Sequence, residues 1–155
     1  LDGLYNDWRG QIENQADLYA LLEVSSDEQL VPTRGTDWGD NGVWRNLHDH
    51  NWDANHSFVK AVWNNLNQNV FRATTIIDAR SGGNAQQVAE AKFLRALATY
   101  HLVDLYGQAP FRTPDEGQDV NPSVKNRNRY AELTPLSETV SVLQQRIEQM
   151  LGKGY

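Results

Sequence analysis

The sequence predicts an all-α fold. Apolar residues recur at helical spacing in four stretches, and no stretch alternates apolar and polar residues as a strand would. Long segments rich in Gly, Asp and Asn separate the helical stretches. The chain has 155 residues, of which 39% are hydrophobic and 22% charged, which is enough to bury a real core. We therefore expect a single helical domain with long structured loops.

The first helix is expected over residues 2–24. Apolar side chains follow a helical period from Leu4 to Leu22, with one polar interruption at Gln15. Residues 25–56 then lack any period and are expected to form one long structured loop. Loops of that length without regular structure are uncommon and are often functional.

Two further helices, 57–80 and 85–106, are expected to form an antiparallel hairpin, because only the turn SGGN (81–84) separates them. The second of these helices is apolar around most of its circumference, which predicts that it is buried between neighbours. Gly107 is well placed to end it, since glycine readily adopts the left-handed conformation that follows many helices.

Within 85–106, small residues flank an aromatic one: Ala89, Phe93 and Ala96 follow the spacing A-x3-F-x2-A. That spacing is typical of the second helix of a tetratricopeptide repeat, where small side chains let a partner helix approach closely. The scaffold is therefore expected to consist of tetratricopeptide-like helical hairpins.

A second polar loop over 108–133 and a last helix over 135–151 complete the expected chain. Thr134 and Pro135 suit the N-cap and the first helical position. The apolar face of this helix is expected to need a partner surface. It consists of Leu143, Ile147 and Leu151.

Composition excludes several classes of function. The chain has no cysteine, so it has no disulfide, thiol nucleophile or zinc–thiolate site. Its net charge is -6 and it has no basic stripe, which argues against nucleic acid as a partner. No apolar run reaches the length of about 20 residues that spans a bilayer. The first residues, LDGLYNDWRG, do not have the pattern of a signal peptide.

The acidic residues of the 25–56 loop do not form a known metal or catalytic motif. Counted from Asp37, an EF-hand loop would need an oxygen ligand where Gly39 stands and a glutamate where His48 stands. An irregular calcium site stays open, and no cofactor is expected. Carboxylates that could serve a glycosidase are present, but no nucleophile elbow or phosphate-binding loop is found. We expect a protein that is not an enzyme, with a carbohydrate-active enzyme as one alternative.

Three tryptophans, Trp38, Trp44 and Trp52, lie in the segment TRGTDWGDNGVWRNLHDHNW (33–52), which has almost no aliphatic side chain. An indole can cover the apolar face of a sugar ring, while neighbouring polar side chains such as Arg34 and Asn51 can bind its hydroxyls. The competing explanation is that the indoles anchor the loop to the helices. From composition alone the two explanations are nearly balanced.

Three segments resemble the SusD/RagB-like family of glycan-binding outer-membrane lipoproteins of Bacteroidetes. The signature helix of the family is similar to EAKFLRALATYHLVDLYGQAPF (90–111). Its N-terminal segment is similar to EVSSDEQLVPTRGTDWGDNGVWRNLHDHNWDANH (23–56), and VWNNLNQNVFRATTIID (62–78) also fits. The segments follow in the order and at the spacing of the family.

The resemblance implies a function in nutrient uptake. Family members capture oligosaccharides at the cell surface, cover a SusC-like TonB-dependent transporter and do not catalyse a reaction. Ligand residues carried over from the family would be Arg34, Asn51 and Trp52, with Trp38 and Trp44 as further candidates. The alternative outside this class is a helical-repeat module that binds a protein partner.

Family members are several times longer than this chain and carry a lipidated cysteine. We therefore expect 1–155 to be an N-terminal portion of a SusD/RagB-like domain, whose membrane anchor is absent from the sequence. The glycan and the particular transporter are not determined by the residues.

Overall fold

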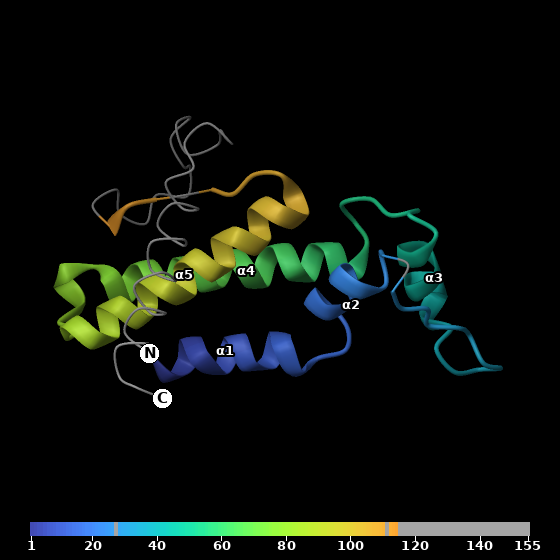
Figure 1. Ribbon diagram of the computed structural model, residues 1–155, viewed down its shortest axis with the longest axis horizontal. Coiled ribbons are helices and arrows are strands. Elements are labelled where there is room, and N and C mark those ends of the chain that lie inside the picture. Colours follow the sequence, from blue (N-terminus) through green and yellow to red (C-terminus); the bar gives the residue numbers. More distant parts are fainter. Residues whose placement is uncertain (27, 111, 115–155) are drawn as a thin grey trace, which may run out of the picture. The chain divides into compact units, whose positions relative to one another are not determined.

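The computed structural model describes residues 1–26, 28–110 and 112–114 (Figure 1). This part of the chain is mostly helical and contains no β-strand, which confirms the all-α prediction. The helix predicted over 135–151, with Leu143, Ile147 and Leu151, and nearly all of the loop predicted over 108–133 lie outside the described residues. The helical elements in order are α1 (Asp2–Glu13), α2 (Leu18–Glu23), the 3-10 helix η1 (Asp40–Gly42), α3 (Val43–His48), α4 (Ser57–Ile77), the 3-10 helix η2 (Ala79–Ser81) and α5 (Ala85–Tyr106).

The single helix predicted over 2–24 is wrong, because α1 and α2 are separate helices. The break follows from local polar chemistry. The Asn14 side chain accepts a hydrogen bond from the Ala16 N–H (3.1 Å) and donates one to the Asp17 carboxylate (3.3 Å). Asp17 then adopts a positive φ of 55°. Asparagine side chains compete with the helix for backbone partners in this way, and this competition breaks the helix. The apolar period of the sequence nevertheless continues across the turn.

Residue contacts divide the chain into two compact units. The first, Tyr5–Asn65, is called the loop unit below, and the second, Leu1–Leu4 with Leu66–Tyr155, is called the hairpin unit. Helix α4 contributes residues to both. The buried apolar side chains of the loop unit are Trp8, Leu18, Ala20, Leu21, Val24, Trp44, Leu47 and Val62. Those of the described hairpin unit are Leu4, Leu66, Val70, Ala73, Ala91, Leu94, Ala96, Ala98 and Leu102.

In the hairpin unit, α5 runs back from a short turn that follows α4 (Figure 1). Helix α4 ends at Ile77, three residues before the predicted end. It stops there because the Asp78 side chain accepts the Arg80 N–H (2.9 Å) and starts η2. Gly82, at φ 69°, then reverses the chain in the left-handed region that glycine adopts without steric cost.

The bounds predicted for the third helix, 85–106, are confirmed by α5. Asn84 and Gln87 form a reciprocal capping box: the Asn84 side chain accepts the Gln87 N–H (2.9 Å), and the Gln87 side chain accepts the Asn84 N–H (3.0 Å). At the other end Gly107 has φ 73° and donates its N–H to the Val103 carbonyl (2.9 Å). Both ends of α5 are therefore fixed by residues next to it in the sequence.

The predicted burial of α5 is largely confirmed. Its buried side chains are Ala91, Leu94, Arg95, Ala96, Ala98, Thr99 and Leu102. Of the tetratricopeptide-type positions, Ala96 is buried and Phe93 half-buried, whereas Ala89 is exposed. The tetratricopeptide-like character of the fold stays a prediction.

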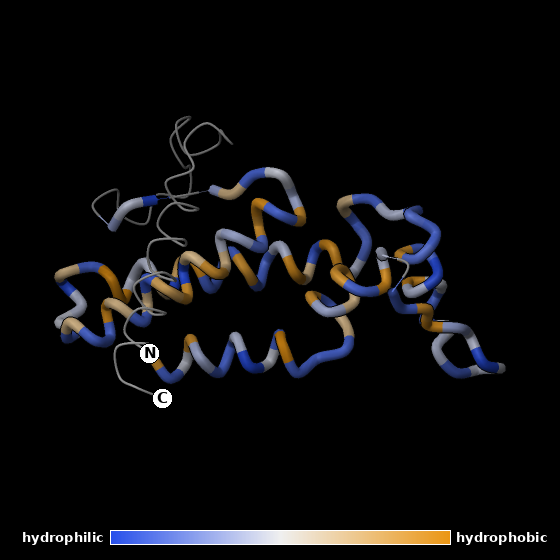
Figure 2. Tube along the Cα trace, in the orientation of Figure 1, coloured by the Kyte–Doolittle hydropathy of each residue, from blue (hydrophilic) through white to orange (hydrophobic). Residues whose placement is uncertain are grey.

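The loop predicted over 25–56 contains more regular structure than its sequence suggested. It includes η1 and α3, although Figure 2 shows how few apolar residues the segment has. Helix α3 has six residues, of which Trp44 and Leu47 are buried. A helix this short is unstable by itself in water, so its tertiary contacts must maintain it.

Candidate functional site

The tryptophan loop, residues 33–52, begins with a tight turn. The Arg34 N–H donates to the Asp37 carbonyl (3.0 Å), and the Asp37 N–H donates to the Arg34 carbonyl (2.9 Å). Gly35 lies inside the turn at φ 62°. The turn leaves the Arg34 side chain exposed at the surface of the loop unit.

The backbone after this turn is held in conformations that side-chain-bearing residues rarely adopt. Trp38, Asp40, Asn41 and His50 have φ values of 59°, 38°, 55° and 55°. Left-handed conformations cost roughly 1–2 kcal/mol for a residue with a Cβ. They persist only where surrounding contacts maintain them, and they are concentrated at functional sites. The contacts that maintain this loop are therefore part of the site.

Trp44 is the buried centre of the loop, with 6% of its surface exposed. Its indole N–H donates to the Asp40 carboxylate (2.9 Å). Its ring packs edge-on against Phe58, with ring centroids 4.8 Å apart and planes at 67°. These contacts connect α3 to the first turns of α4 within the loop unit, so the structure gives Trp44 a packing role.

Trp38 and Trp52 are the exposed tryptophans, at 45% and 42%. Trp38 makes an edge contact with Trp44 at 5.6 Å between ring centroids. Trp52 makes one with His50 at 5.2 Å, and the His50 Nε2–H donates to the Ser25 carbonyl (2.7 Å). Each exposed indole thus rests by an edge contact on a ring that is itself fixed, and much of its surface stays open to solvent.

The end of the loop is fixed through its backbone. The Asn51 N–H donates to the Asn46 carbonyl (2.8 Å), while the Asn51 side chain is exposed. His56 forms a hydrogen bond through Nε2 to the Val43 carbonyl (3.0 Å), at the start of α3. These bonds join α3 to the segment that follows it.

The structure brings together only some of the predicted ligand residues. Trp38 touches Trp44, but among the described residues no hydrogen bond or ring contact joins Arg34 or Asn51 to Trp52. The ligand role of all five residues stays a prediction. The sequence suggested Asp40 and His50 only as polar neighbours of the tryptophans, and the supporting roles of Asp40, His50 and Phe58 were not predicted. Asp40 and His50 lie four and two residues before the tryptophans that they contact, whereas Phe58 lies fourteen residues after Trp44.

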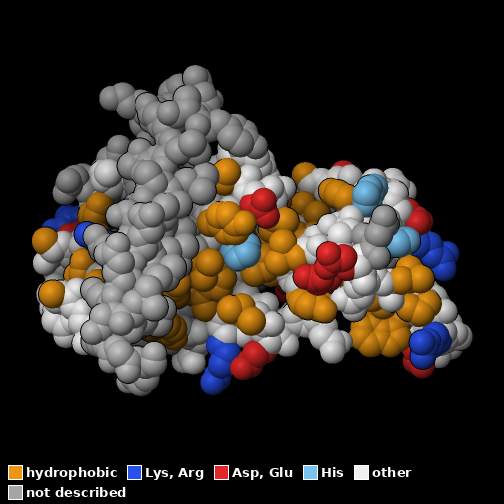
Figure 3. Space-filling model, in the orientation of Figure 1, with side chains coloured by type: hydrophobic (Ala, Val, Ile, Leu, Met, Phe, Trp, Pro, Cys, Tyr) orange, Lys and Arg blue, Asp and Glu red, His pale blue; other side chains and the backbone are white. Residues whose placement is uncertain are grey.

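The surface around the loop is mixed, with hydrophobic side chains among polar and charged ones (Figure 3). In Figure 3, hydrophobic side chains gather over the part of the molecule where Figure 1 places α3 and the preceding loop, with Lys or Arg side chains next to them. Within residues 1–26, 28–110 and 112–114, no three His, Asp or Glu side chains gather closely enough to hold a metal ion. None of the helices in these ranges is long and apolar enough to cross a membrane.

The chain is similar to a known protein. Over 93 residues the chain is 36% identical to SusD-like protein P25 of Formosa agariphila, an alignment that covers 56% of this chain. The chain spans 17% of the length of that relative. No family model matches the chain, and no solved structure matches it. The matched part of the chain is thus similar to a SusD-like protein.

Proposed function

We propose that this chain is part of a SusD-like, cell-surface subunit that captures oligosaccharides for a TonB-dependent outer-membrane transporter. The similarity to a SusD-like protein and the three matching segments support this proposal. In it, residues 1–155 are an N-terminal portion of a longer SusD/RagB-like domain. A SusC-like transporter is the partner, and a lipid anchor outside this sequence attaches the protein to the outer membrane.

The observation that carries the proposal is the pair of exposed indoles on a loop with a fixed backbone. Trp38 and Trp52 each leave much of the ring open, and each is oriented by a neighbouring ring. Exposed aromatic side chains on a rigid loop lose little conformational entropy when a ligand stacks on them. A sugar ring offers a flat C–H face of suitable size for such stacking.

The proposed roles of the five candidate residues differ. Trp52 and Trp38 would stack on sugar rings, and Arg34 and Asn51, whose side chains are exposed, would donate hydrogen bonds to sugar hydroxyls. Trp44 is buried, so its part would be to hold Trp38 in place through their edge contact. The proposed activity is binding without catalysis.

A glycan array followed by calorimetric titration of the best oligosaccharide tests this function. Removing Trp52 loses the stacking and the apolar area buried by the sugar, together about 1.5–3 kcal/mol. Trp52→Ala should therefore weaken binding about tenfold to a hundredfold. Tyr19→Ala is the matched control, because Tyr19 is an aromatic residue of α2 with the same 42% exposure.

Two results would contradict the proposal. One is the absence of binding to any oligosaccharide on the array by the full-length protein. The other is an equal loss of affinity in Trp52→Ala and Tyr19→Ala, which would mean that the tryptophan loop is not the binding surface.

A further inference from the structure

A pocket of about 240 Å³ lies in the hairpin unit, between one face of α4 and the segment that follows α5. One wall of the pocket is formed by α4 residues at helical spacing, among them Val70, Phe71, Thr74 and Thr75. No part of the tryptophan loop lines it. Ligand pockets for drug-sized molecules measure about 300–1,000 Å³, so this one suits a smaller molecule of about one ring.

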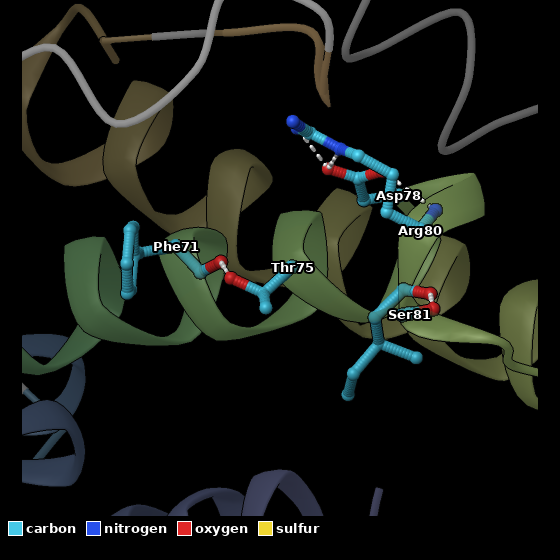
Figure 4. A network of polar contacts seen from close by, with 6 residues as sticks. Phe71, Thr75, Asp78, Arg80 and Ser81 are labelled. Atoms are coloured by element: carbon cyan, nitrogen blue, oxygen red, sulfur yellow. Dashed lines mark hydrogen bonds and ion pairs between the residues drawn. The ribbon is translucent and has the colours of Figure 1, made fainter.

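The α4 wall of the pocket offers one flat apolar surface and two hydrogen-bond acceptors. The Phe71 side chain is 52% exposed. The Thr74 hydroxyl donates to the Val70 carbonyl (2.8 Å), and the Thr75 hydroxyl donates to the Phe71 carbonyl (3.1 Å; Figure 4). Because both protons are already used, these hydroxyl oxygens face a ligand as acceptors for its O–H groups.

The charge of the pocket comes from two arginines and one aspartate. Figure 4 shows Asp78 and Arg80 side by side beyond the end of α4. The Arg80 Nε lies 3.0 Å from each Asp78 carboxylate oxygen. These hydrogen bonds lower the pKa of Asp78 to about 2, so the carboxylate is ionised at neutral pH and offsets the charge of Arg80.

Arg112 provides the remaining charge. The described lining has two cations, Arg80 and Arg112, and one anion, Asp78, so with Asp78 bonded to Arg80 these residues leave one net positive charge, on Arg112. Arg112 lies between Pro110 and Pro114, which also line the pocket. Proline fixes its own φ and restricts the residue before it, which narrows the backbone conformations available to this segment.

We propose that this pocket binds a carboxylate carried on a six-membered ring, with Arg112 holding the carboxylate and Phe71 covering one face of the ring. A guanidinium group matches a carboxylate in a two-pronged geometry, which gives both affinity and selectivity. The chain as a whole has a net charge of -6, so attraction of an anion must come from this local arrangement. The inference does not depend on the function proposed for the tryptophan loop.

The test is a titration of the full chain, monitored by NMR chemical shifts. It uses two pairs of probes, each consisting of a carboxylate and its neutral counterpart. Glucuronate is compared with glucose, and benzoate with benzamide, so that a sugar acid and an aromatic acid are distinguished. At least one of the two carboxylates should bind, about tenfold or more tightly than its neutral counterpart. Its shifts should centre on Phe71, Thr74 and Thr75.

Variants locate the binding. Arg112→Gln should weaken binding of the carboxylate about tenfold or more, and Phe71→Ala should weaken it several-fold. Arg9→Gln is the charge-matched control in the loop unit, where Arg9 is exposed and lies 3.8 Å from Glu13. It should bind as the unaltered chain does. Thermal melting of each variant shows that it is folded.

Several outcomes would overturn the inference. These are no binding of either carboxylate, equal binding of the acid and neutral probes, and an equal loss of affinity in Arg112→Gln and Arg9→Gln. Loss in Trp52→Ala with no change in Arg112→Gln would assign the ligand to the tryptophan loop. That result would remove this pocket as a site while leaving the proposed glycan function standing.

Discussion

Helix α5 and the tryptophan loop differ in what holds them. The bonds that fix the ends of α5 join residues three or four positions apart, Asn84 with Gln87 and Gly107 with Val103. The loop also has local bonds, such as Trp44 with Asp40, but two of the bonds that fix it join distant residues. The link from His50 to Ser25 spans 25 positions, and the one from His56 to Val43 spans 13.

This difference explains why one region was predictable and the other was not. A capping box and a C-terminal glycine act within a single helical turn, so they can be recognised from residues that are close together in the sequence. Contacts between distant residues leave no periodic signal. The two regions should therefore respond differently to substitution, and the following predictions test that difference.

The largest effect is expected at the buried centre of the loop. Trp44→Ala removes a buried indole that packs on Phe58 and binds Asp40, and should lower the free energy of unfolding by about 3–5 kcal/mol in urea denaturation. Trp52→Ala, as the exposed control, should change it by less than about 0.5 kcal/mol. Similar values for the two variants would contradict the division into a packed and an exposed tryptophan.

The end of α5 should give the next effect. Gly107 has φ 73°, so Gly107→Ala forces a Cβ into the left-handed region at a cost of roughly 1–2 kcal/mol. Gly3→Ala is the matched control. A Cβ at Gly3 would meet nothing within 4 Å, and Gly3 lies in α1, where alanine should stabilise by roughly 0.5–1 kcal/mol. Denaturation that shows the same sign for both variants would contradict the assigned role of Gly107.

A third prediction concerns the start of α5, where the Asn84 cap should stabilise the helix without contacts from distant residues. Asn84→Ala removes the capping side chain and should cost about 1 kcal/mol of stability, whereas Asn64→Ala, at an exposed position inside α4, should not destabilise. By circular dichroism, a peptide of residues 84–107 should be partly helical and lose helicity with Asn84→Ala. A peptide of residues 33–56 should be unstructured. Helix in that second peptide would show that the loop also folds by local signals.

The smallest effect is expected from His101 on α5. Burial lowers the pKa of His101 below its ordinary value of 6.5, against the raising effect of Asp104. The unfolded chain then takes up a proton at a higher pH than the folded chain does. Stability should therefore fall as the pH drops from about 7 towards 5. In His101→Gln, denaturation at several pH values should give a shallower slope, and an unchanged slope would exclude this residue as the cause.

The sequence by itself determined the all-α class and the bounds of α5. Both signals of this helix, its apolar period and the terminating Gly107, lie within one continuous stretch of the sequence. The break after α1 was also encoded locally, in Asn14 and Asp17, but the apolar period continued through it and concealed it. Local polar chemistry overrode periodicity there.

Only the tertiary structure decided the rest. It showed that α3 exists, and it separated the buried Trp44 from the exposed Trp38 and Trp52, three indoles with similar polar neighbours in the sequence. The physical reason is that a tryptophan becomes buried only where another part of the chain covers it. Phe58, which covers Trp44, lies fourteen residues further along the chain, and no sequence pattern within the loop predicts this contact.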